Sequence, residues 1–155
     1  MKSKEIKVAN IWNKEKEKSL GEFILSHSRK QSKERQLKNE LLAIKYQIED
    51  FIESEDTFGR RELLEFVKMY LKTLNVTQKK LATLFEMKDS NLHKYLVGER
   101  KLNSDIVLKL SSFSHLSPEY WLKIEIKNEL FEINKEKKKN KDYNKYDYRN
   151  LLTVH

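Results

Sequence analysis

The sequence predicts an all-α protein with three parts: a helical N-terminal extension over residues 1–59, a core domain over 60–134 and a basic tail over 135–155. Apolar residues recur at spacings of three and four in successive stretches, which is the period of helices with one buried face. Only one proline and three glycines interrupt the 155 residues, so few breaks between helices are expected.

Composition narrows the class of protein. Lys and Arg (32) exceed Asp and Glu (24), for a net charge of +8. This positive charge favours nucleic acid as a partner, because binding releases counterions. A chain that is simply rich in lysine would have the same net charge. The absence of cysteine excludes disulfides and thiolate chemistry. No apolar run approaches the ~20 residues of a membrane span. The opening MKSKEIKVANIW lacks a signal-peptide core, so we expect a cytoplasmic protein with no membrane partner.

The first 32 residues are an arm with two small apolar patches. One surrounds Ile11 and Trp12, the other surrounds Phe23 and Ile24, and a polar link from Ser26 to Ser32 follows. Two interpretations are open. The arm either packs loosely over the neighbouring domain, or it binds a partner through its exposed aromatic residues.

Lys33 to Asp56 is predicted to be a helix. Its apolar stripe packs on its own chain or forms a dimerisation or partner seam. The acidic end opposes the helix dipole, so we expect the helix to stop near Ser54, with Gly59 as the hinge to the core domain. The stripe residues, at spacings of 4, 3, 4 and 3, are Leu37, Leu41, Ile44, Ile48 and Phe51.

The core domain begins with a predicted helix from Arg61 to Leu74, which Asn75 ends in a left-handed conformation. Thr77 then caps a pair of short helices spanning Thr77 to Lys101. Met87 lies in the turn between them and Gly98 closes the second. Their inward positions are Leu81, Ala82, Phe85, Leu92, Tyr95 and Leu96.

Two further helices complete the domain. Asn103 or Ser104 caps the first. Ser117 caps the second, with Pro118 in its first turn, where a missing N–H costs nothing. The second helix has more apolar residues than one stripe holds, so part of its surface is expected to face another chain. These residues are Trp121, Leu122, Ile124, Ile126, Leu130, Phe131 and Ile133.

The tail joins a lysine run to three tyrosines. Its low hydrophobicity predicts disorder in the first half. Three interpretations are open: a solvated tail, phosphate contacts from Lys135 to Lys141, or docking of the tyrosines and Leu151-Leu152 on a partner.

The pair of short helices resembles a known family. The pattern Thr77-Gln78-x-x-Leu81-Ala82-x-x-Phe85-x-Met87-x-x-Ser90-x-Leu92-x-x-Tyr95-Leu96-x-Gly98-x-Arg100 is similar to the helix-turn-helix of phage-repressor-like (XRE) regulators. With Ser117-Pro118-Glu119-Tyr120-Trp121-Leu122, the chain resembles the HigA-like antitoxins, also called plasmid-maintenance antidote proteins. The resemblance covers roughly Glu62 to Leu130 and implies a five-helix repressor-like domain.

By this resemblance, the second short helix reads the major groove of double-stranded DNA, and a homodimer binds an approximately palindromic operator. Gln78 would brace a phosphate or a neighbouring residue of the second helix. Asn91 suits adenine and Lys94 suits guanine or phosphate, whereas Lys88 and Arg100 suit backbone phosphates. The candidate DNA-binding residues are Gln78, Lys88, Asp89, Ser90, Asn91, Lys94 and Arg100.

Two positions depart from the family pattern. Glu86 stands at the turn position where glycine is usual, so it must adopt a strained conformation or a different turn. Lys88 stands where a small capping residue is usual, so Asp89 or Ser90 is expected to cap instead. Asp89 either accepts a hydrogen bond from cytosine or repels DNA. A degenerate helix pair that keeps only a scaffold role is the alternative.

The resemblance implies an antitoxin of a type II toxin–antitoxin module, which represses its own operon and neutralises a small ribonuclease toxin. The alternatives are an orphan or phage-type regulator without a toxin, and an adaptor for protein contacts alone. We predict no enzyme, cofactor or metal, because no glycine-rich phosphate loop, nucleophile elbow or H-E-x-x-H pair occurs. The scattered histidines are His27, His93, His115 and His155.

Overall fold

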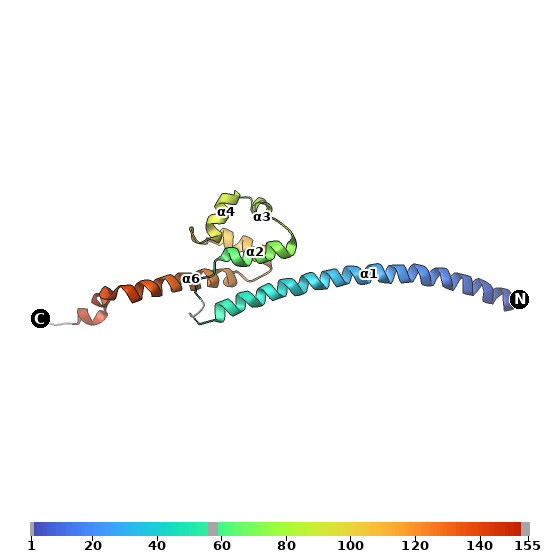
Figure 1. Ribbon diagram of the computed structural model, residues 1–155, viewed down its shortest axis with the longest axis horizontal. Coiled ribbons are helices and arrows are strands. Elements are labelled where there is room, and N and C mark those ends of the chain that lie inside the picture. Colours follow the sequence, from blue (N-terminus) through green and yellow to red (C-terminus); the bar gives the residue numbers. More distant parts are fainter. Residues whose placement is uncertain (1, 56–58, 153–155) are drawn as a thin grey trace. The chain divides into compact units, whose positions relative to one another are not determined.

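The computed structural model describes residues 2–55 and 59–152, apart from the side chains of 2–13 and 141, and its described elements are all helical (Figure 1). This confirms the predicted all-α class. The order is α1 (Lys2–Glu53), α2 (Leu63–Leu74), α3 (Gln78–Leu84), α4 (Asp89–Leu96), α5 (Ser104–Ser114), α6 (Pro118–Lys139) and the 3-10 helices η2 (Lys141–Tyr146) and η3 (Tyr148–Leu151). In the described ranges, no helix combines the length and apolarity that a membrane crossing requires.

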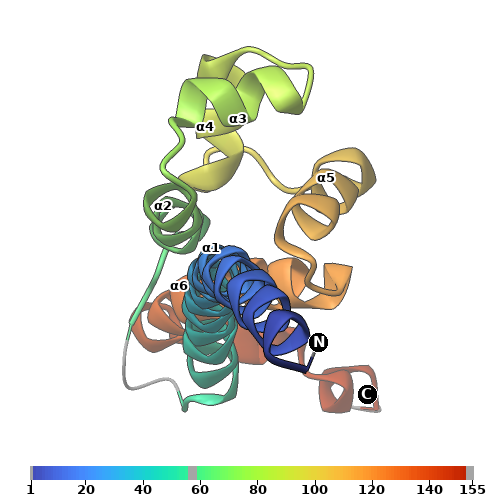
Figure 2. The same cartoon turned by 90° about the vertical axis from the view of Figure 1, so that its right-hand side faces the viewer.

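The chain divides into two compact units, Met1–Leu42 and Ala43–His155. The first unit is the N-terminal part of α1. Its residues from 14 onward are exposed except for Gly21 and Leu41, which are half-buried. The second unit contains the end of α1 and all later helices. Within it, the α3–α4 pair stands at one end, connected to α2 and α5 (Figure 2).

Helix α1 starts far earlier than expected. The prediction of a polar link from Ser26 to Ser32 and of a helix starting at Lys33 is wrong, because α1 is continuous from Lys2. Lys, Arg, Gln and Glu favour helix, and an exposed serine costs only about 0.5 kcal/mol. The predicted stop near Ser54 is confirmed, since α1 ends at Glu53. The patch around Ile11 and Trp12 lies outside the described side chains.

The end of α1 belongs to the core of the second unit. Ile44, Ile48 and Phe51 are buried, and the Phe51 ring lies 5.7 Å from that of Phe66. Leu37, in the first unit, stays 38% exposed. The expected stripe therefore packs on its own chain over residues 44–51, within the segment that the sequence pattern assigns to the extension.

Polar contacts hold the end of α1 against α6. The Tyr120 hydroxyl donates to the Glu49 carboxylate at 2.8 Å. The Lys127 ammonium donates to the carbonyls of Ile52 and Ser54. A cation at a helix C-terminus is favourable because it faces the unpaired carbonyls. Lys127 thereby offsets the acidic end that the sequence places there.

The predicted caps are mostly confirmed. Asn75 ends α2 in the left-handed region at φ 54°. The Thr77 hydroxyl accepts from the N–H of Lys80 at 3.2 Å. Asn103, rather than Ser104, caps α5 by accepting from the N–H of Ile106 at 2.9 Å. Ser117 does precede α6, but its side chain makes no capping bond, so that part of the prediction is wrong.

The tail is more ordered than its composition suggests. The disorder predicted for its first half is wrong, because α6 continues to Lys139 and η2 begins at Lys141. Lys and Glu are good helix formers, and lysines in the last turn favour the negative end of the helix dipole. On α6, Trp121 and Ile124 are fully buried, whereas the surplus apolar residues stay 39–56% exposed. They are Leu122, Ile126, Leu130 and Ile133.

Candidate nucleic-acid interface

Helices α3 and α4 pack against each other through a small apolar contact. Leu81 and Ala82 of α3 and Leu92 and Leu96 of α4 are each at most 2% exposed. The small side chain of Ala82 lets the two helices approach closely. The pair is therefore a helix, a turn and a helix held by a few side chains.

The turn closes with a non-glycine residue in a left-handed conformation. Glu86 has φ 57°, so the strained conformation is the option that this chain adopts. Its N–H donates to the Thr83 carbonyl at 3.0 Å, and the N–H of Met87 donates to the Ala82 carbonyl at 3.0 Å. These bonds form a Schellman-type closure, in which glycine is usual at the position of Glu86. They compensate part of the ~1–2 kcal/mol that a left-handed non-glycine residue costs.

Asp89 does not cap α4. The prediction that Asp89 or Ser90 replaces Lys88 as the cap is wrong: Lys88 occupies the cap position without a side-chain bond, and Asp89 is the first helical residue. The amide of Gln78 donates to the Asp89 carboxylate at 2.9 Å. It also lies 3.5 Å from Nδ1 of His93. Gln78 therefore braces the start of α4, where an acidic residue also suits the helix dipole.

The exposed face of α4 is polar. At about 100° per residue, Ser90 and Lys94 lie opposite the buried Leu92 and Leu96. Both are exposed, and Asn91 beside them is half-buried. Within residues 2–55 and 59–152, the side chains of Ser90, Asn91 and Lys94 make no hydrogen bond or ion pair, so they are available to a ligand.

The surroundings of this face are basic. Residues 77–101 contain six Lys and Arg against three acidic residues, which is +3. The Arg100 guanidinium lies over the Tyr95 ring, 5.3 Å from its centroid. Lys79 and Lys80, in the first turn of α3, are exposed. The sequence pattern did not single out these two lysines, although their place at the start of the first helix was a signal for phosphate contact.

The far end of α4 is anchored by a residue that no local pattern indicated. The Arg60 guanidinium donates to the Val97 carbonyl at 3.0 Å and lies 3.8 Å from the Glu132 carboxylate. Gly98 beside it has φ +83°, and a Cβ there would lie 2.7 Å from Nη2 of Arg60. Arg60 thus ties the C-terminus of α4 to α6.

A hollow of about 350 Å³ lies next to this anchor, with residues of α2, α4 and α6 in its wall. One wall residue, Glu125, accepts from the N–H of Leu102 at 2.7 Å. Burial raises the pKa of Glu125 above its ordinary value, and this outweighs the opposing effect of that hydrogen bond. The hollow is therefore lined by a carboxylate that is already engaged in holding the chain after α4.

Comparison of the chain with models of known protein families, with curated proteins and with solved structures found no match. The resemblance drawn from the sequence therefore rests on the residues quoted for it.

Proposed function

We propose that the protein is a sequence-specific DNA-binding regulator that places α4 in the major groove. The observation that carries this proposal is the exposed face of α4, where Ser90, Asn91 and Lys94 are polar, unengaged and next to one another. A helix of this kind, braced by a preceding short helix, has the shape and the hydrogen-bonding groups that base edges require.

The side chains have distinct roles in this proposal. Asn91 pairs with adenine, and Lys94 contacts guanine or a phosphate. Lys79, Lys80 and Lys88 take backbone phosphates, which position the protein without specifying sequence. Arg100 does the same from the other end of α4.

Asp89 serves as a support for α4 rather than as a base-reading residue. Its carboxylate is engaged by Gln78. The bond directs this carboxylate toward α3, while its negative charge stays in place because the amide donor is neutral.

We further propose a homodimer on an approximately palindromic operator, with a role as the antitoxin of a toxin–antitoxin module. The dimer is supported by the exposed apolar residues of α6, since patches of this kind usually mark contacts. Binding of a small toxin protein is supported by Leu20, Phe23, Ile24 and Leu25 of α1, which are 55–66% exposed.

Selection of binding sites from a random duplex library tests DNA reading. Asn91→Ala and Lys94→Ala are each expected to weaken binding to the selected site by about 1–3 kcal/mol. Lys68→Ala on α2 is the matched control for Lys94→Ala, because it removes an exposed charge outside α4 and outside the proposed dimer contact on α6. If the α4 variants bind as well as the parent while remaining folded, α4 is not the reading helix.

Co-expression with the product of an adjacent small reading frame tests the antitoxin role. Rescue of growth together with a stable complex is the expected outcome. A harmless neighbour that does not co-purify would leave a regulator without a toxin partner.

A further inference from the structure

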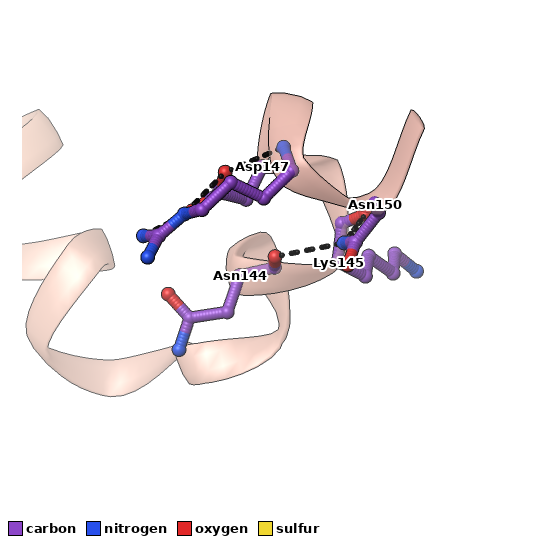
Figure 3. A network of polar contacts seen from close by, with 5 residues as sticks. Asn144, Lys145, Asp147 and Asn150 are labelled. Atoms are coloured by element: carbon purple, nitrogen blue, oxygen red, sulfur yellow. Dashed lines mark hydrogen bonds and ion pairs between the residues drawn. The ribbon is translucent and has the colours of Figure 1, made fainter. Parts of the chain in front are cut away.

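The segment from Phe131 to Leu152, called here the tail module, comprises the end of α6 with η2 and η3. Its polar side chains hold its own backbone. Asp147 accepts from the N–H of Arg149 at 2.9 Å and pairs with its guanidinium at 2.8 Å. The Asn150 amide donates to the carbonyls of Lys145 at 2.8 Å and Asn144 at 3.4 Å (Figure 3). The hydrogen bonds from Arg149 lower the pKa of Asp147, so this carboxylate is charged at neutral pH.

The three tyrosines of the tail module face solvent. Tyr143, Tyr146 and Tyr148 are 64%, 70% and 70% exposed. The Tyr143 and Tyr146 rings lie 5.9 Å apart at 49°, and the Lys145 ammonium is 5.1 Å from the Tyr146 centroid. Arg149 and Asn150 are exposed as well, so the hydrogen-bonded polar groups and the rings share one solvent-facing segment. Exposed tyrosines of this kind are suited to a contact surface.

The charge around these rings is positive. Residues 135–155 carry seven basic and three acidic side chains, which is +4. Lys137, Lys138 and Lys139 are exposed, and among the described side chains they form no ion pair. One of the three acidic residues, Asp147, is already paired with Arg149.

The same part of α6 packs against η2 and contains a hollow of about 500 Å³. Its lining combines an aromatic ring with cations: Phe131, Asn134, Lys135, Lys137 and Lys138. The Lys135 ammonium lies 4.4 Å from the Phe131 ring centroid, so a cation and an aromatic ring are adjacent here, which suits a phosphate next to its base.

We propose that the tail module binds single-stranded nucleic acid, with its tyrosines stacked on unpaired bases and its lysines on phosphates. Every base has a π-face, so stacking needs no particular sequence. In a duplex those faces are covered by neighbouring bases, so the rings select the single strand. The proposal is independent of DNA reading by α4, because it uses other residues and another form of nucleic acid.

Fluorescence anisotropy of the full-length protein with labelled oligouridylate and oligothymidylate tests the proposal, and the two strands separate RNA from DNA. The double variant Tyr143→Ala/Tyr146→Ala is expected to bind about fivefold or more weakly for each ring removed. The matched variant Tyr143→Phe/Tyr146→Phe keeps both rings and is expected to bind like the parent. Lys137→Ala and Lys138→Ala are expected to reduce the slope of log affinity against log salt by about 0.7 for each phosphate that the missing ammonium had neutralised.

Because the tyrosines are exposed, the alanine variant is expected to keep the parent's thermal midpoint, which circular dichroism checks. It is also expected to keep the duplex binding that Asn91→Ala loses, so failure of one proposal is visible separately from failure of the other. Equal strand binding by the parent and the alanine variant overturns the proposal. So does a phenylalanine variant that loses as much as the alanine variant. Binding of the parent to vesicles containing phosphatidylserine, without binding to strands, would overturn it too and assign the tail module to a lipid surface instead.

Discussion

At the centre of the second unit, the Tyr70 ring lies 5.8 Å from Phe113 and 6.3 Å from Trp121. The side chain is 2% exposed. Its hydroxyl has no hydrogen-bond partner among the described residues. Burial raises the pKa of Tyr70 to about 12. The ring stabilises the core, whereas the hydroxyl is desolvated without compensation.

Tyr70→Phe is therefore expected to stabilise the protein by about 1 kcal/mol, since it removes an unsatisfied polar group and keeps the ring. Urea unfolding at neutral pH measures this difference. A variant less stable than the parent would show that the hydroxyl has a partner.

The same substitution has a signature at high pH. The unfolded tyrosine ionises near pH 10, and the folded one near 12. Between these values the unfolded state alone loses the proton, so the parent loses stability as the pH rises from 10 to 12. Tyr70→Phe lacks this contribution. The difference in unfolding free energy between the two proteins is thus expected to widen over that range and to stay constant below it.

At the scale of elements, the orientation of α4 depends on contacts at both of its ends. Gln78 holds Asp89 at the start, and Arg60 holds the Val97 carbonyl at the finish. Gly98 permits the second contact, because its positive φ turns the chain and its missing side chain leaves room for the guanidinium.

Gly98→Ala is accordingly expected to destabilise the second unit by about 1–2 kcal/mol, through left-handed strain and displacement of Arg60. Thermal unfolding of the second unit and affinity for the selected duplex measure the two consequences. Gly21→Ala is the contrasting substitution, because nothing lies within 4 Å of the added Cβ. It is expected to raise helical content, since alanine favours a helix interior by about 1 kcal/mol. Equal effects of the two substitutions would contradict the role given to Gly98.

For the molecule as a whole, the two units differ in how they are stabilised. The buried apolar residues lie between Ile44 and Ile124, all in the second unit. In the first unit, the described side chains have no core of their own. Its helix therefore depends on intrinsic helix propensity and side-chain contacts along the helix.

A fragment of residues 43–155 is expected to unfold at the same midpoint as the second unit of the full chain. A fragment of residues 60–155 lacks Ile44, Ile48 and Phe51, and is expected to be far less stable. Ile48→Ala in the full chain is expected to cost about 2–5 kcal/mol, as for other buried large-to-small substitutions. Similar stability of the two fragments would show that the end of α1 does not belong to the core.

The sequence by itself determined what depends on neighbours three or four residues away. Apolar periodicity predicted the class and the helices α2 to α6, and short-range capping predicted Asn75, Thr77, Asn103 and the left-handed turn at Gly98. The prediction from sequence was wrong where it relied on polar composition and ignored helix propensity, at Ser26 to Ser32 and in the first half of the tail. Both segments lack a core but remain good helix formers.

Only the tertiary structure decided which faces meet. Arg60 reaches Val97 across 37 positions and Asn128 bonds the backbone of Arg61 across 67, separations at which no local period carries information. Local periodicity also carries no information on the Gln78–Asp89 bond, which directs the Asp89 carboxylate. It does not show that residues 44–51 of α1 pack into the core either. Apolar residues at helical spacing show that one face of a helix is apolar. The surface that covers that face is selected by how the whole unit buries its side chains and pairs its polar groups.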